Sequence, residues 1–189
     1  MVIGKFEPRA SRPTSMKDCV TIALDEALTA MEESFYDLAD EQVQALPLSG
    51  RNNIMTIVLH LQENADKHCC LFQTGVLVLD HEKFLAIRKD GSPDGMTAEE
   101  NRVPVKELIK RQHRLRDAAM EGLRAASNDD LLGARAGHEM YWWQERHRKS
   151  VDAYMRVICH VNAHVRQIWA LRAAMGAVDE KGWPEQHCH

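Results

Sequence analysis

Four long segments of the chain carry apolar residues at every third or fourth position, and this period restricts the fold more than any other feature. The spacing matches the 3.6 residues per turn of an α-helix, so each segment is predicted to be a helix with one apolar face. Four such helices in 189 residues can bury these faces together in one domain. The sequence therefore predicts an all-α fold, a four-helix bundle. The apolar positions are Val20, Leu24, Leu28, Met31, Phe35 and Leu38 in the first segment, Ile54, Ile57, Val58, Leu61, Ala65 and Phe72 in the second, Val105, Leu108, Ile109, Leu115, Ala119 and Leu123 in the third, and Tyr154, Val157, Val161, Val165 and Ile168 in the fourth.

Residues that favour helix ends mark the predicted boundaries. Short polar side chains cap a helix by accepting hydrogen bonds from its free backbone N–H groups, proline fits the first turn, and glycine or proline ends a helix. The predicted starts follow Thr14 or Ser15, Asn52 or Asn53, and Pro104, and the fourth helix follows a polar connection that leads to Tyr141-Trp142-Trp143. The predicted ends lie before Leu46-Pro47, at Gly75, around Ser127-Asn128 and at Met175-Gly176.

The connections between these helices are less regular. Residues 76–89 fit an extension of the second helix, a separate short helix or paired strands, and we favour a helix. Residues 89–95 contain two glycines, two aspartates and a proline, and are predicted to form a loop. The expected organisation is an N-terminal arm at 1–15, a bundle domain at 16–176 with a variable connection between its second and third helices, and a coil tail at 177–189.

Charge and cysteine content argue against several classes of protein. The chain has 24 Lys and Arg residues against 28 Asp and Glu, a net charge of −4, so it lacks the basic surplus typical of proteins that bind nucleic acid or anionic membranes. No apolar run approaches the ~20 residues that cross a bilayer, and the N-terminus lacks the apolar stretch of a signal peptide. The five cysteines have no C-x-x-C spacing and are expected to be free thiols. We therefore expect a cytoplasmic protein that binds neither nucleic acid nor a membrane.

Two histidines of the fourth predicted helix carry the clearest chemical signal. His160 and His164 are four positions apart, so they lie on one face, at the edge of the apolar arc and within it. Two such imidazoles can bind one transition-metal ion if another helix provides a third ligand. His60 lies at the border of the apolar face of the second helix, and His68 is the competing candidate. An alternative interpretation is that these histidines are buried side chains that only form hydrogen bonds, because the pair alone occurs often by chance.

These motifs resemble those of the DinB/YfiT-like metalloenzymes. The resemblance rests on His60 within Asn53-Ile-Met-Thr-Ile-Val-Leu-His60-Leu and on His160-x-x-x-His164-x-x-Gln167-Ile168, and it extends over residues 16–175. It implies a four-helix bundle, frequently a homodimer, in which His60, His160 and His164 hold one divalent metal ion. The chain departs from the family pattern at Arg166, where glycine is common, and at Val165, where a basic residue is frequent.

The family resemblance also implies a reaction. DinB/YfiT-like proteins include metal-dependent transferases that join a low-molecular-weight thiol to an electrophile, so the resemblance implies a thiol transferase whose partners are a small-molecule thiol and an electrophile. Three neutral imidazoles leave one coordination position open, at which a divalent metal lowers the pKa of a bound thiol or water. The alternatives are a metal-dependent hydrolase and a non-catalytic stress-response or interaction protein with a structural metal.

The ligand types leave the metal and its coordination number open. Imidazole suits several divalent metals, among which we favour zinc or nickel. A di-iron carboxylate centre is disfavoured, because such centres need two Glu-x-x-His pairs and the chain has none. Asn64, one turn after His60, is a candidate fourth contact that would close the site.

Three other groups of residues carry weaker signals. Tyr141-Trp142-Trp143 can stack a substrate ring but is more typical of a hydrophobic anchor. The C-terminal His187-Cys188-His189 is poorly suited to bind a metal, because adjacent side chains point apart and a chain terminus is costly to order. An arginine of the third helix that faces the metal pocket could bind a carboxylate of an acidic thiol, although most basic runs are solvated helix faces. The basic residues are Lys106, Lys110, Arg111, Arg114 and Arg116 on the third helix, and Arg146, His147, Arg148 and Lys149 near the start of the fourth.

Overall fold

The computed structural model of the chain describes residues 13, 15–47, 52–133 and 149–178. Within these ranges the protein is all-α and has no strand, as predicted. None of the described helices is long and apolar enough to span a membrane. The elements are α1 (Met16–Glu33), α2 (Asp40–Gln44), α3 (Ile54–Ala65), the π-helix η1 (Asp66–Leu71), α4 (Phe72–Thr74), α5 (Glu82–Asp90), α6 (Pro93–Thr97), the 3-10 helix η2 (Glu99–Asn101), α7 (Val105–Ala125), α8 (Asn128–Leu132) and α9 (Ser150–Ala174).

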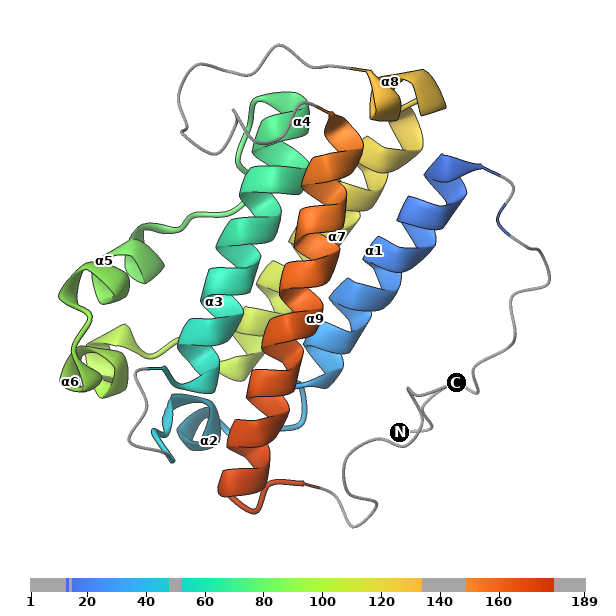
Figure 1. Cartoon of the computed structure of the whole chain (residues 1–189). Helices are drawn as coiled ribbons and strands as arrows, with labels where there is room; N and C mark the ends of the chain where they lie inside the picture. The colour runs from blue at the N-terminus through green and yellow to red at the C-terminus, as the bar shows by residue number, and fades with distance from the viewer. Residues whose placement is uncertain (1–12, 14, 48–51, 134–148, 179–189) are drawn as a thin grey trace.

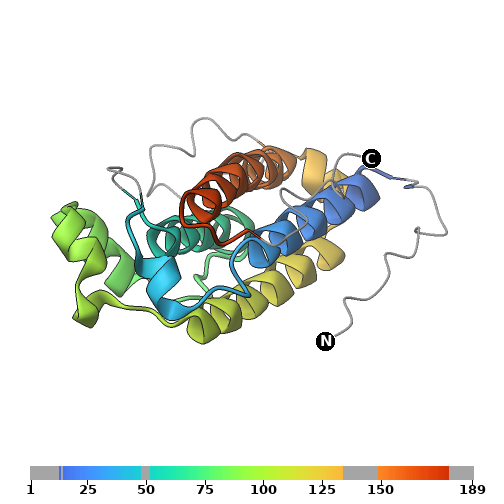
Figure 2. The same cartoon turned by 90° about the horizontal axis from the view of Figure 1, so that it is seen from below.

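Four long helical stretches lie side by side: α1, α3 with its continuation η1, α7 and α9 (Figure 1). Each of α7 and α9 packs against both α1 and α3, so the order around the core is α1, α9, α3, α7 (Figure 2). In Figure 1, α1 and α9 run downwards, and α3 and α7 run upwards. Because α3 and α7 are parallel neighbours, the chain must return along their length between them. Residues 75–104 make this return, with α5 and α6 on the outer side of α3.

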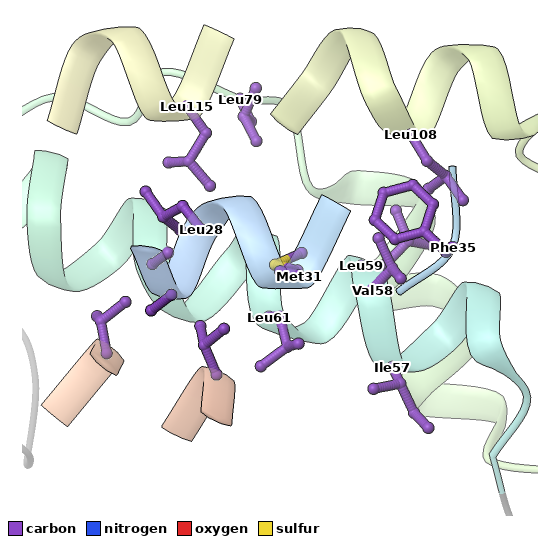
Figure 3. Packing of buried hydrophobic residues seen from close by; sticks show 14 of the residues in the cluster. Leu28, Met31, Phe35, Ile57, Val58, Leu59, Leu61, Leu79, Leu108 and Leu115 are labelled. Atoms are coloured by element: carbon purple, nitrogen blue, oxygen red, sulfur yellow. The ribbon is translucent and has the colours of Figure 1, made fainter. Parts of the chain in front are cut away.

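The four apolar stripes predicted from the sequence meet in one core, except that Phe72 packs in a separate small cluster with Ala153. Ile109 and Val165 are partly buried, and every other position of the four stripes is buried. Figure 3 shows side chains of α1, α3 and α7 interleaved there, among them Leu28, Leu61 and Leu115. Each large apolar side chain that leaves water contributes about 1.5–3 kcal/mol, so this burial holds the four helices together.

The first predicted helix is shorter than expected. It was predicted to end before Leu46-Pro47, but α1 ends at Glu33, a turn follows, and α2 begins at Asp40. The Ser34 hydroxyl donates a hydrogen bond of 2.6 Å to the Met31 carbonyl, and Asp37 binds Arg172 of α9 through contacts of 2.6 and 2.8 Å. These contacts hold the turn against the core. The apolar period did not reveal it, because Phe35 and Leu38 stay buried within the turn.

The return segment settles two other predictions. Residues 76–81 are not helical, and of the three alternatives for 76–89 the structure has the separate short helix, α5. The predicted loop at 89–95 is wrong in part, because Lys89 and Asp90 complete α5 and Pro93 begins α6. Gly91 ends α5 with a φ of 63°, a left-handed conformation that favours glycine.

Most of the predicted helix ends are correct. Ser15 caps α1 by accepting a hydrogen bond from the Asp18 N–H, and Pro104 directly precedes α7. Gly75 ends the α3–η1–α4 stretch with a φ of 81°, and α9 ends at Ala174, close to the predicted Met175-Gly176. The third helix ends at Ala125, two residues before the predicted stop. The predictions for Tyr141-Trp142-Trp143, for His187-Cys188-His189 and for most of the arm fall outside the described residues.

Asn53 ties three segments together and gives the fold a direct test. Its side chain is fully buried: Oδ1 accepts from the Thr56 N–H, while Nδ2 donates to the carbonyls of Gln44 and Met96. We expect Asn53→Ala to lower the free energy of unfolding by about 2–3 kcal/mol in urea titrations, because it removes a helix cap and leaves buried carbonyls unpaired. The neighbouring exposed Asn52 supplies the control, and Asn52→Ala should change stability by less than about 0.5 kcal/mol. Equal effects of the two substitutions would contradict this role of Asn53.

Candidate metal centre

Helices α3 and α9 bring His60, His160 and His164 together. One nitrogen of each ring can be chosen so that all three lie within 4.8 Å of one another. The ring centroids are 5.0 Å apart for His60 and His160, 5.3 Å for His60 and His164, and 4.5 Å for His160 and His164. The histidines that the sequence singled out on two helices, 100 residues apart, thus form one cluster, which we call the three-histidine cluster.

The core fixes how these three side chains face one another. His60 lies between Leu59 and Leu61, which are both buried, and is itself partly buried. On α9, Val157 and Val161 pack in the same core and hold the helix so that His160 and His164 point toward α3. The cluster therefore lies where the apolar faces of α3 and α9 give way to their polar faces, as the helical spacing indicated.

The hydrogen bonds of the cluster place its ring nitrogens where a metal ion could bind them. His60 Nε2 and His160 Nε2 lie 2.8 Å apart, so one ring donates to the other. Around a tetrahedral ion with bonds of about 2.0–2.1 Å, two ligand nitrogens lie about 3.3 Å apart, so the rings need to separate by only about half an ångström. His164 Nδ1 lies 2.7 Å from Gln167 Oε1 and donates to it, which leaves Nε2 of His164 with a free lone pair.

Burial and neighbouring groups keep the rings of His60 and His160 neutral. Burial, the neighbouring His160 and His164, and Arg88 lower the pKa of His60 to about 4, against a weaker opposing effect of Glu63. The pKa of His160 is also lowered, first by burial and then by His164 and Arg156. Neutral imidazole is the form that binds metal ions, so at pH 7 these two rings are already in that form.

The other candidate ligands lie outside the three-histidine cluster. His68 is buried in η1 and does not join the group of close donor atoms, so it is not the competing ligand. Cys159 precedes His160 but is exposed and also stays outside this group. The Oδ1 atom of Asn64 is buried and has no hydrogen-bond partner among the described residues. That oxygen is free to accept a contact, and its role as a fourth ligand stays a prediction.

A buried polar network that was not predicted from the sequence lies at the start of η1, where α3 ends. Asp66, at the start of η1, is fully buried and accepts hydrogen bonds from the Val78 and Leu79 N–H groups and from His81 Nε2, which lies 2.9 Å away. Burial raises the pKa of Asp66, but the hydrogen bonds from His81 and the two N–H groups outweigh it, so its pKa is below the ordinary value. The network fixes the non-helical residues 76–81 against α3. The only signal in the sequence was a charged residue within an apolar segment.

A pocket of about 250 Å³ lies on the outer side of α3, between α5 and the start of α7. Leu59, the neighbour of His60, contributes to its wall, as do Arg102 and Arg111. Phe84 of α5 lines the pocket as well, and its ring centroid lies 6.1 Å from that of His60. Phe84 thus contacts both the pocket and the three-histidine cluster. Of the basic residues of the third predicted helix, Arg111 is the one that lines this pocket.

No family model matches the sequence, and no curated protein or solved structure has a significant match to it. The resemblance to DinB/YfiT-like proteins therefore depends on the motifs around His60, His160 and His164 alone. The function has to be argued from the three-histidine cluster itself.

The low pKa of His60 predicts that the metal-free protein loses stability in mild acid. Its pKa is about 4 in the folded chain and near 6.5 in an unfolded one, so between these pH values the unfolded chain binds more protons and stability falls as the pH falls. We expect the urea midpoint to decrease from pH 6.5 to pH 4, and to decrease less in His60→Gln.

The matched control is His113→Gln, because His113 is an exposed histidine of α7 that pairs with Glu32. Its pH dependence should stay close to that of the wild type. If His60→Gln and the wild type lose stability with the same slope between pH 6.5 and 4, the buried neutral state of His60 is refuted.

Proposed function

We propose that this protein is a metal-dependent enzyme of thiol-transferase type, folded as a four-helix bundle of the DinB/YfiT-like kind. In this proposal His60, His160 and His164 hold one divalent ion, zinc or nickel. The observation that carries it is the convergence of three ring nitrogens within 4.8 Å from two separate helices. From the resemblance of the motifs we further propose that the substrates are a low-molecular-weight thiol and an electrophile, and that the protein forms a homodimer.

The residues around the three-histidine cluster fit a bound metal ion. Three nitrogen donors are the protein ligand set of several zinc enzymes, in which a fourth position stays open. The low pKa values of His60 and His160 remove the proton competition that weakens metal binding near pH 7. Gln167 provides the hydrogen-bond acceptor that metal-binding histidines usually have on their other nitrogen, and it fixes the tautomer and orientation of His164.

The chemistry follows from the open position. A divalent ion with three neutral imidazole ligands lowers the pKa of a thiol or a water at its open position, which supplies a nucleophile near neutral pH. Phe84 shields one side of His60 from water, and Asn64 offers a buried acceptor one turn along α3. Three ligands with an open position favour a catalytic site over a structural one, because structural zinc sites are usually closed by four protein ligands.

Metal content tests the site. We expect the chain shortened at residue 182 to bind about one equivalent of zinc or nickel after reconstitution, and His164→Ala to bind far less, because a two-ligand site is weak. The shortened chain lacks His187, Cys188 and His189, whose side chains could otherwise bind metal and raise the measured content. His113→Ala removes an exposed histidine and should retain the full equivalent. A shortened wild-type chain that binds no zinc or nickel would disprove the metal centre.

Turnover tests the reaction. We expect the metal-loaded protein to join a low-molecular-weight thiol to a chromogenic aryl halide faster than the uncatalysed rate, and to lose this rate on addition of a chelator and in His164→Ala. The control is Asn162→Ala, an exposed position between the two histidines of α9, which should keep the wild-type rate. Turnover that persists unchanged without metal would contradict the proposed mechanism. A metal-loaded protein inactive toward every thiol tested but active on an ester would point to the hydrolase.

A further inference from the structure

The pocket beside α3 has one partly buried charge without a carboxylate in direct contact. Its apolar wall comes from Leu59, Phe84, Val103 and Pro104, and its volume of about 250 Å³ is just below the range typical of drug-sized ligands, so it suits a smaller molecule. The cationic group that reaches this wall from α7 is Arg111, whose side chain is partly buried. The pocket therefore combines an apolar surface with a guanidinium group.

Arg111 is held in place by a side-chain amide and an imidazole. Its Nε donates a hydrogen bond of 3.0 Å to Gln62 Oε1, and its Nη2 lies 3.5 Å from His81 Nδ1. The His81 ring is fixed in turn by Asp66, so the guanidinium is positioned by the buried network. Among the described residues no carboxylate oxygen lies within 4.0 Å of Arg111. Burial lowers the pKa of Arg111, while the more distant carboxylates of Asp80, Glu107 and Asp66 act in the opposite direction.

The other charges of the pocket are already compensated or exposed. Arg102 pairs with Glu99 at 3.3 Å and with Glu41 at 3.7 Å, and its Nε donates to a neutral amide. Glu107 is exposed and lies 3.8 Å from Lys110, while Asp80 is exposed and accepts the N–H of Glu82 at the start of α5. Solvent screens these two carboxylates much more than it screens the partly buried guanidinium. Lys83 also lines the pocket, but it is exposed and donates to the Arg102 carbonyl. An anion inside the pocket would therefore interact mainly with Arg111.

We propose that this pocket binds the carboxylate of a small organic acid, with Arg111 as its principal contact. A guanidinium presents its N–H groups as a planar fork that matches the two oxygens of a carboxylate, and the remaining N–H groups of Arg111 have no partner among the described residues. The apolar wall of Leu59, Phe84 and Val103 accommodates a short carbon chain. Binding needs no metal, so the proposal stands or falls separately from the three-histidine cluster. Phe84, which contacts both sites, places the acid next to the proposed centre.

Calorimetric titration of the full-length protein with butyrate, acetate and inorganic phosphate tests this site. We expect saturable binding of butyrate, weaker binding of acetate because it lacks a chain for the apolar wall, and the weakest binding of phosphate. Arg111→Gln should weaken butyrate binding at least tenfold, since a charge-assisted hydrogen-bond pair is lost. Arg111→Lys, which keeps the charge without the fork, should fall between the two.

Three variants with intact folds make the test decisive. Glu107→Gln removes a negative charge from the exposed rim and should strengthen butyrate binding severalfold. Arg114→Gln is the matched control, because Arg114 lies one turn along α7 from Arg111, is exposed and donates to the Val78 carbonyl. The butyrate affinity of Arg114→Gln should equal that of the wild type. His164→Ala should also bind butyrate as the wild type does, because the acid does not bind at the three-histidine cluster.

Four results would overturn the proposal. They are the absence of butyrate binding in the millimolar range, wild-type affinity in a folded Arg111→Gln, weaker binding in Glu107→Gln, and loss of binding in His164→Ala. The last result would assign the anion to a metal at the three-histidine cluster, so it would support the metal centre while refuting the Arg111 site. If the protein binds no metal but binds butyrate in a way that depends on Arg111, the Arg111 site is supported and the metal centre is refuted.

Discussion

The packing of α3 against α9 is the constraint on which the rest of the protein depends. The two helices run in opposite directions, and their register sets His60 against the His160–His164 pair. Apolar side chains fix this register: Leu61 on α3 and Val157 and Val161 on α9 are buried in the common core. A slip of one turn, about 5.4 Å, would separate the imidazoles beyond the reach of a single ion. The hydrophobic core therefore determines the geometry of the polar centre.

The sequence could predict those parts of the molecule that local signals determine. Caps at Ser15 and Asn53 and the stop at Gly75 were correct, because each acts within one turn of its own helix. The apolar faces were also predicted correctly, because the helical period is a local signal. The positions of His60 and His160 at the edges of these faces followed from them. The break after α1 could not be predicted, since the apolar period continues through the turn and the contacts that hold it, such as the one between Asp37 and Arg172, join distant parts of the chain.

The non-local polar contacts could not be predicted from the sequence either. Asp66 accepts hydrogen bonds from backbone groups 12 and 13 residues further along the chain, and no local pattern shows which N–H groups a buried carboxylate will find. The third helix has several basic residues, and nothing in the sequence distinguishes Arg111 from the others. Arg111 lines the pocket because residues 76–104 lie across α3. The return between the parallel helices α3 and α7 thus produces both the network and the pocket, because it brings His81 against Asp66 and Phe84 against His60.

We propose above all that His60, His160 and His164 bind one metal ion together. X-ray absorption spectroscopy of the zinc- or nickel-loaded protein, without added thiol, tests this claim most directly, since it reports the ligand atoms themselves. We expect about three imidazole nitrogens, at about 2.0–2.1 Å for zinc, plus one light atom at the open position. In His160→Ala we expect about two imidazoles. Sulfur at about 2.3 Å from the metal, or at most one imidazole bound to it, would disprove the three-histidine site.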